Sequence, residues 1–305
     1  MQFFNLIRKS VLPISGASSI EAYGGKLFVV GDDSPTLYVT DSSWKSEENI
    51  VLIPEKRGRI PKMEKMDLEA STIIDNNGAK SLFILGSASM PGREVAIVAP
   101  VKNLHDFVKY DCSIFFNRLR QQFGLKSVNI EGVANVENRY LIIACRSSKT
   151  NPQNYLFATP TDFFKKQLSS YIEMVRLDLP ENIGISGLSF IWGQNKAIFT
   201  ATVENSPDSI QDGEIGDSYF GYINMPVINP AHYHRAKRPA VIPAWIGNLN
   251  SYSRAFWGEK VESVAIVERY QNSRIRKYTL NFVSDNDNGV SHIFEVELNL
   301  PPCKS

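Results

Sequence analysis

Acidic side chains recur at the starts of apolar segments along this chain. Glu69, Glu131 and Glu262 each lie between a branched or leucine residue and a small residue. Glu21 and Ser186 occupy comparable positions in two further segments. Carboxylates that converge in a pocket of low polarity repel one another, so they need protons, basic partners or a cation. Because carboxylate oxygens suit hard metals, the first chemical hypothesis is a pocket for Ca²⁺ or Mg²⁺.

These five segments, four with an acid and one with Ser186, recur at an interval that predicts a repeat architecture. Positions 21, 69, 131, 186 and 262 are 48, 62, 55 and 76 residues apart by subtraction. Each segment begins a hairpin pattern, with turn residues such as Gly24-Gly25 between two apolar runs. Four antiparallel strands repeated at this interval are typical of a β-propeller.

The sequence therefore predicts an all-β protein in which residues 1–305 form one β-propeller domain, with four-stranded antiparallel blades around a central axis. Five blades are favoured, and six would require a degenerate blade within residues 205–260. The expected strands are 20–23, 27–30, 36–40 and 50–53; 68–74, 81–85, 94–99 and 103–110; 128–136, 140–144, 155–158 and 171–179; 185–191, 197–202, 219–224 and 240–245; 261–267, 277–283 and 292–297.

The fifth group is one strand short. We expect the N-terminal segment 3–14 to supply the missing strand and so to close the ring. Short helices are expected in loops between blades, one over residues 115–120, where apolar residues recur at helical spacing, and one opening at Thr161, a plausible cap.

The start of a blade's first strand and the end of its second lie at the same end, because the two strands are antiparallel. Polar residues at these places should form an acidic funnel on one face, which would bind a small ligand, an ion or a protein segment. The candidate ligand-binding residues are Glu21, Asp32, Asp33, Asp67, Glu69, Asn129, Glu131, Arg146, Glu204, Asp285 and Asp287, with Lys62 and Lys65 from a basic loop.

Two interpretations of these acids remain open. In the first, some of Glu21, Asp32, Glu69 and Glu131 hold Ca²⁺. In the second, basic residues of the 59–65 loop and Arg146 neutralise the acids, which then hydrogen-bond to neighbouring blades and hold the ring together.

Other motifs carry less chemistry. His232-Tyr233-His234 could place two histidines on one side of a strand, but no third metal ligand is nearby. The serines of segment 15–19 lack the strand, turn and helix of a hydrolase nucleophile elbow. No catalytic group of residues is identifiable by spacing.

Composition bounds the partners and the compartment. The 305 residues include 33 basic and 32 acidic side chains, so the net charge of +1 does not favour nucleic acid or an anionic membrane. Cys112, Cys145 and Cys303 lack zinc or disulfide spacing and are expected to be reduced thiols. Arg8 and Lys9 interrupt the N-terminal apolar run, so neither a membrane span nor a signal peptide is expected. A cytoplasmic monomer is favoured, with periplasmic location or export as the alternative if a signal peptide has been removed.

Five motifs together resemble an uncharacterised bacterial family of β-propellers. They are Gly31-Asp32-Asp33-Ser34-Pro35, Asp67-Leu68-Glu69-Ala70, Asn129-Ile130-Glu131-Gly132, residues 200–205 with 212–215, and Ser284-Asp285-Asn286-Asp287. The resemblance covers nearly the whole chain and implies a propeller without an established activity. More distantly, the pattern is similar to phytase-like esterase propellers and SdiA-regulated propellers. The phytase-like resemblance implies Ca²⁺ beside basic residues, here Arg146, Lys62 and Lys65, although Ser186 departs from the acid of the other repeats.

Two functions follow from the sequence. The first is a propeller that binds a ligand in its funnel without catalysis. The alternative is a calcium-assisted hydrolase of a small phosphoester or lactone.

Overall fold

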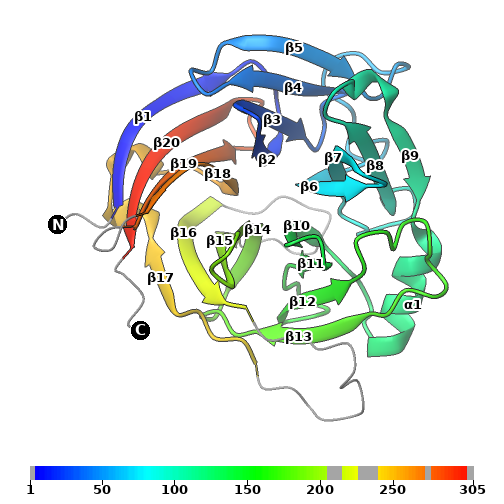
Figure 1. Cartoon of the computed structure of the whole chain (residues 1–305). Helices are drawn as coiled ribbons and strands as arrows, with labels where there is room; N and C mark the ends of the chain where they lie inside the picture. Colours follow the sequence, from blue (N-terminus) through cyan, green and yellow to red (C-terminus); the bar gives the residue numbers. More distant parts are fainter. Residues whose placement is uncertain (1–3, 205–214, 226–239, 272–275, 301–305) are drawn as a thin grey trace.

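In a computed structural model the chain forms five four-stranded antiparallel sheets arranged in a ring (Figure 1). The structure describes residues 4–204, 215–225, 240–271 and 276–300. The prediction of a five-bladed β-propeller is confirmed. A sixth blade within residues 205–260 is wrong, because the strands described there are the two outer strands of the fourth blade.

Four blades use strands that are consecutive in the chain. The first contains β2 (Ala17–Tyr23), β3 (Lys26–Gly31), β4 (Thr36–Asp41) and β5 (Ser46–Val51), and the second contains β6 (Leu68–Asn76), β7 (Ala79–Gly86), β8 (Val95–Pro100) and β9 (Val108–Asp111). The third contains β10 (Ile130–Val136), β11 (Tyr140–Cys145), β12 (Asn154–Thr159) and β13 (Glu173–Leu177), and the fourth contains β14 (Ile183–Ile191), β15 (Lys196–Glu204), β16 (Ile215–Asn224) and β17 (Trp245–Asn248).

The fifth blade joins the two ends of the chain. Its strand order is β1 (Phe4–Leu12), β20 (Ser291–Leu300), β19 (Arg276–Asp285) and β18 (Val261–Gln271). The N-terminal strand β1 is the outer strand of this sheet and runs antiparallel to β20, blue beside red in Figure 1. This pairing links the first strand to the last blade, so the ring is closed by backbone hydrogen bonds.

One buried carboxylate reinforces this closure. Glu259 accepts hydrogen bonds from Lys9 Nζ at 2.6 Å and Ser284 Oγ at 2.6 Å, and His292 Nδ1 lies 3.1 Å from it. Burial alone would raise the pKa of Glu259, but the hydrogen bonds from Lys9 and Ser284 outweigh burial and lower it. A single ionised side chain therefore ties β1, β19 and β20 together.

The apolar core is divided among the spaces between neighbouring blades. Five clusters of buried residues fill these spaces, and each innermost strand contacts the innermost strand of the next blade. The cluster between the second and third blades also contains Phe115, Phe116 and Leu119 of α1 (Ser113–Phe123). This helix, expected at residues 115–120, ends at Gly124, which adopts a positive φ of 66°.

The helix predicted to open at Thr161 is wrong. Residues 161–169 form successive turns, including a hydrogen bond from Phe163 N to Pro160 O. Phe163 and Phe164 are adjacent yet both buried against Phe83, with ring centroids 6.0 and 5.5 Å away. Packing of two consecutive rings against the same residue overrides the weak local preference for a helix. Three short 3₁₀ turns complete the described elements: η1 (Leu104–Asp106), η3 (Leu249–Ser251) and η4 (Arg254–Phe256).

Candidate functional site

The innermost strands β2, β6, β10, β14 and β18 share a β-bulge near their first residues. In each strand one residue is skipped by the pairing with the second strand. The skipped residues are Ser18, Glu69, Glu131, Ser186 and Glu262. A bulge re-aims a side chain relative to the regular alternation of the strand. Four of these side chains line one cavity, whereas Ser186 Oγ instead donates to Val261 O at 2.7 Å.

This register corrects the placement of Glu21. Ser18, not Glu21, occupies the bulge in the first blade, and Glu21 pairs in regular register with Phe28 further along β2. Its side chain therefore lies near the opposite end of the strand and lines a different cavity. A sequence signal for the correct alignment existed in the small residue that follows each bulge: Ser19, Ala70, Gly132, Gly187 and Ser263.

Close packing near the axis explains the small residues. A Cβ added to Gly132 would lie 2.9 Å from the backbone nitrogen of Leu188. One added to Gly187 would lie 2.6 Å from the carbonyl oxygen of Glu262. The innermost strands approach each other too closely here for a larger side chain in these two blades.

The cavity at the bulge end, which we call the funnel, has a volume of about 870 Å³. Ten of the thirteen residues predicted from the sequence line it: Asp32, Lys62, Lys65, Asp67, Glu69, Asn129, Glu131, Arg146, Asp285 and Asp287. The lining also includes Glu262, one of the repeat acids that the sequence singles out, and it includes Ser18, Arg93, Lys260 and residues 147–149, 152–154 and 177–184. The hairpin pattern locates strand ends, so it does not single out these two loops, although one directly follows Arg146 and the other directly precedes the Ser186 segment.

The two remaining predicted residues are Asp33 and Glu204. Asp33 accepts a hydrogen bond from Ser15 Oγ at 3.0 Å and pairs with Arg59, and it does not line the funnel. The side chain of Glu204 lies outside the described residues. Glu204 is a candidate because the sequence pattern places it at the end of the second strand of the fourth blade. In the observed strand pairing, the residue equivalent to Arg146 of the third blade and Asp285 of the fifth is Thr202. His232-Tyr233-His234 also lies outside the described part of the chain.

Lysine and arginine side chains neutralise part of the acidic cluster. Lys65 Nζ contacts Asp32 and lies 2.8 Å from Asp67 Oδ1, and Arg93 Nη1 donates to Asp67 Oδ2 at 2.6 Å. Burial alone would raise the pKa of Asp67, but Lys65 and Arg93 outweigh burial and lower it. Burial would lower the pKa of Lys65, but Asp32 and Asp67 raise it overall. Asp67 also accepts a hydrogen bond from Ser87, so it is an ionised and fully partnered group.

Further cations are placed among the remaining acids. Lys260 Nζ lies 3.1 Å from Glu262 Oε1 and 3.5 Å from Asp287 Oδ2. Arg146 reaches the fourth blade, where its Nη2 donates to Thr202 Oγ1 at 2.8 Å. Among the described lining residues, nine carboxylates face six lysine or arginine side chains. The funnel is thus a surface of mixed charge in which carboxylates outnumber cations, with Lys62, Lys65 and Arg146 among the acids as the sequence candidates included.

Two carboxylate oxygens are left without a hydrogen-bond donor. Asp32 Oδ1 and Asp285 Oδ1 are buried, and neither has a partner within the described structure. Burial, together with Asp32 and Asp287, raises the pKa of Asp285 to about 7. Burial and the neighbouring charges of Asp67 and Asp32 raise the pKa of Glu69 well above its ordinary value. A bound proton, hydrogen-bond donor or cation at the inner end of the funnel would therefore stabilise Asp32, Asp285 and Glu69.

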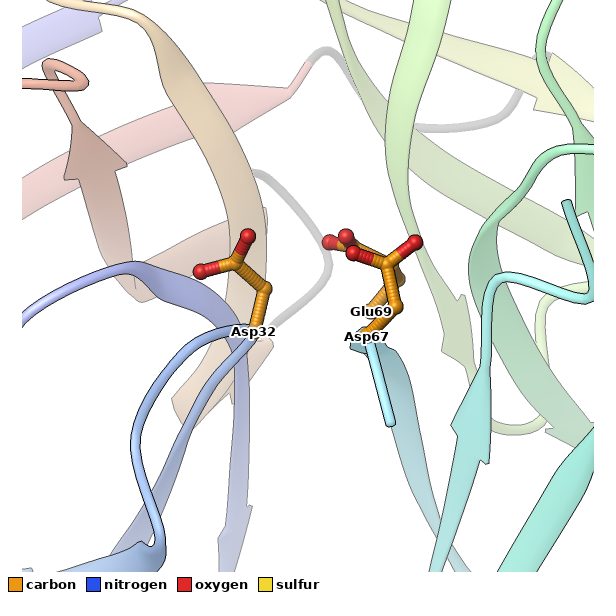
Figure 2. Close-up of side chains that lie close together, drawn as sticks. All are labelled: Asp32, Asp67 and Glu69. Atoms are coloured by element: carbon orange, nitrogen blue, oxygen red, sulfur yellow. The ribbon is translucent and has the colours of Figure 1, made fainter. Parts of the chain in front are cut away.

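Asp32, Asp67 and Glu69 form the tightest group of oxygens. One oxygen from each lies within 4.8 Å of the others, and Figure 2 shows Asp32 facing Asp67 and Glu69 from the neighbouring blade. This set differs from the predicted metal ligands, because Glu21 lies at the other end of β2 and Asp67 joins the group. Three carboxylates can supply oxygen ligands to a hard cation, although Lys65 already contacts two of them.

The fold and this cavity define the class: a five-bladed β-propeller with a charged, polar funnel at one end of its axis. Residues 13–298 match the Family of unknown function (DUF6929), so the chain belongs to that family. No curated protein sequence matches the chain. The findings show no link to phytase-like esterase or SdiA-regulated propellers.

Two solved structures illustrate the similarity of fold. The tail fibre of Staphylococcus aureus phage P68 has 8% identity and a TM-score of 0.46, and the match covers 96% of this chain and 53% of that one. This chain thus spans about half the length of the tail-fibre chain. The GH43 endo-arabinanase from Bacillus licheniformis has 12% identity and a TM-score of 0.41, with 94% and 93% covered. At these values the similarities carry no inference about activity. No helix in the described part of the chain is long and apolar enough to cross a membrane.

Proposed function

We propose that this protein is a ligand-binding β-propeller whose funnel holds a small cationic or hydroxyl-bearing ligand without catalysing a reaction. The observation that carries the proposal is the pair of buried oxygens, Asp32 Oδ1 and Asp285 Oδ1, that have no donor within the described structure. A buried acceptor without a donor costs about 1–3 kcal/mol. A ligand that supplies a positive charge or donors at the inner end of the funnel removes this cost.

A hard divalent cation, with Ca²⁺ as the first candidate, is the simplest ligand of this kind. Glu69 and the unpartnered oxygen of Asp32 would be its protein ligands, because Asp67 is already saturated by Lys65, Arg93 and Ser87. Ca²⁺ takes six to eight oxygen ligands, so water or an organic ligand would complete the shell. The ammonium group of Lys65 would compete with the ion, which predicts modest affinity.

A thermal-shift measurement with Ca²⁺, Mg²⁺ and EDTA tests the metal. Binding to the folded state alone raises the Tm by an amount that grows with ligand concentration. We expect Ca²⁺ to raise the Tm of the wild-type protein and to raise it less in Glu69→Gln. Glu181→Gln, which removes an exposed acid at the funnel's edge, is the matched control and should respond like the wild type. An unchanged Tm with all three additives would exclude the metal.

A charged organic ligand is tested separately on the same variants. Asp285→Asn replaces an unpartnered oxygen by a group that can donate, so it should weaken binding of a cationic or polyhydroxyl compound. Equal binding by wild type and Asp285→Asn would contradict the proposal that the unpartnered oxygens define the site.

Calcium-assisted hydrolysis of a small phosphoester or lactone is the second candidate. The observation that favours it is that Lys62, Lys149 and Arg146 share the funnel with the carboxylate group, so an anion and a cation could be held together. The described lining residues include no histidine or cysteine that could serve as a nucleophile or base. Calcium-dependent release of 4-nitrophenol from 4-nitrophenyl phosphate, lost in Glu69→Gln, would favour this candidate over simple binding.

The proposal takes residues 1–305 as one domain that acts as a monomer in the cytoplasm. Reduced thiols support this compartment, because Cys112 and Cys145 are buried and form no disulfide. Burial raises the pKa of each thiol to about 12, so both are expected to be unreactive. Sedimentation of the purified chain measures the oligomeric state.

A further inference from the structure

A second cavity lies at the opposite end of the innermost strands. Its volume is about 410 Å³. The five innermost strands β2, β6, β10, β14 and β18 run from the funnel to this end, and each provides at least one residue of the lining. Its lining residues are Glu21, Ala22, Tyr23, Thr72, Ile73, Lys80, Asn135, Asn138, Ser189, Phe190, Ile191, Trp192, Ile266 and Arg269. We call it the Glu21 cavity.

The walls of the Glu21 cavity are far less charged than those of the funnel. Phe190, Ile191 and Ile266 supply apolar surface, and two aromatic side chains, Tyr23 and Trp192, are 39% and 48% exposed. Large aromatic residues with this much exposure are available to a ligand that enters from solvent. Their rings offer faces that attract a positively charged group.

Glu21 is the one acidic side chain among the described residues of this lining. Its Oε1 accepts a hydrogen bond from the backbone N–H of Ala22 at 2.8 Å, and the Thr72 hydroxyl lies close to it. The other charged or titratable lining residues are Tyr23, Lys80 and Arg269, on β2, β7 and β18. Lys80 pairs with Asp75 at 3.3 Å, and Arg269 donates to the backbone carbonyl of Trp192.

We propose that the Glu21 cavity is a second ligand site, which binds a small organic ammonium ion with its nitrogen against Glu21 and its apolar body against Phe190 and Trp192. Charge complementarity selects the cation, because a carboxyl group in a largely apolar cavity is ionised most readily when a positive charge neutralises it. The aromatic rings stabilise the same charge. A neutral compound of the same shape would gain only the apolar contacts. This site is independent of the proposed function of the funnel.

The protonation of Glu21 gives the site a distinctive pH dependence. Burial raises the pKa of Glu21 to about 7. An ammonium ion binds the ionised carboxylate, so its affinity should increase as the pH rises through 7 and then level off. With half of the sites ionised at pH 7, the affinity at pH 8 should be about tenfold that at pH 6. A neutral ligand should show no such increase.

The test uses 2-phenylethylamine as the probe and 2-phenylethanol as its neutral counterpart of the same shape, with affinities measured by calorimetry on the full chain. We expect the amine to bind more tightly than the alcohol at pH 8, and the difference to disappear in Glu21→Gln. The glutamine keeps the acceptor for Ala22 N–H, so the variant is expected to fold, and the pH series on the wild-type protein provides a second readout that needs no substitution.

Three outcomes would overturn the proposal. They are equal affinity for the amine and the alcohol, amine affinity that does not change between pH 6 and pH 8, and amine binding that Asp285→Asn weakens while Glu21→Gln does not. The last result would place the amine in the funnel. Amine binding that depends on Glu21 and increases with pH would establish the second site.

Discussion

The two ends of the same five strands carry different chemistry. At the funnel, bulges and loops place carboxylates among lysine and arginine side chains, and most of these charges are paired. At the Glu21 cavity, β2 keeps regular register while β18 has a second bulge between Ile266 and Glu268, and apolar, aromatic and a few polar side chains surround one acid. The repeat therefore specifies the scaffold, whereas the local register and the neighbouring loops decide which side chains reach each end.

The two ends are separated by small residues packed near the axis. Ser19 Oγ and Ser71 Oγ lie 2.7 Å apart, and both side chains are buried. Gly132 and Gly187 allow the neighbouring strands to come close. The funnel and the Glu21 cavity share none of their described lining residues, so a substitution in one lining leaves the other lining unchanged.

The largest expected difference between the two ends concerns their lysines. Lys65→Met leaves the buried acids Asp32 and Asp67 without their ammonium partner, and removing one member of a buried charge network costs about 3–5 kcal/mol. Lys80→Met, at the mouth of the Glu21 cavity, breaks a pair that is more than one-third exposed and should cost under about 1 kcal/mol. Urea unfolding at pH 7.5 measures both variants. Similar losses would show that the funnel charges are no more interdependent than surface charges.

The next effect concerns the layer between the two ends. Gly187→Ala places a methyl group 2.6 Å from the carbonyl oxygen of Glu262, and overpacking of this kind costs about 1–3 kcal/mol. The matched control is Ala70→Gly, at the corresponding position of the second blade, which should cost about 0.5–1 kcal/mol through backbone freedom and up to about 0.8 kcal/mol for the lost buried methyl group. Thermal unfolding compares them. If Gly187→Ala is no more destabilising than the control, the axis is less tightly packed than the structure indicates.

The smallest effect is a shared response to pH. Asp285 and Glu21 both have a folded pKa of about 7, above their ordinary values, so their ionised forms are disfavoured in the folded state. Ionisation of each group therefore lowers the free energy of unfolding as the pH rises from about 4 to 7. Above pH 7 the whole of this decrease has occurred. Asp285→Asn and Glu21→Gln should each stabilise the protein by about 1–2 kcal/mol at pH 8 and have little effect near pH 4. Unfolding curves across this range measure the trend, and a stabilisation that does not depend on pH would contradict it.

Much of the fold follows from local sequence patterns. Alternating apolar residues and turn residues such as Asp75 and Gly78 locate the strands, and the repeat interval predicts four-stranded blades. The outer strand of the fourth blade is β17 at Trp245–Asn248 rather than 240–245, because an edge strand has only one neighbour to define its register. Local patterns are also limited for helices. At Thr161, the packing of Phe163 and Phe164 against Phe83 outweighs the helix-cap signal.

The candidate site was less predictable from the sequence. Asp32, Asp67 and Asp285 lie at strand ends, which the hairpin pattern locates to within one or two residues. Arg93 pairs with Asp67 across 26 residues, and the loop residues 177–184 line the funnel next to β14, but no local pattern marks either of them as part of the site. Glu21 shows how a short motif can be aligned three residues out of place when the acid, rather than the small residue after the bulge, is taken as the guide.

Local sequence patterns favour five four-stranded blades and predict the order of their strands, because alternation, turns and spacing depend on residues that are close in the chain. Only the tertiary structure decided which end each acid occupies and which cation neutralises it. A one-residue bulge changes the direction of a side chain, and the pairing of Asp67 with Arg93 spans 26 residues. Such contacts depend on how the blades and loops pack in three dimensions, so local sequence patterns do not predict them.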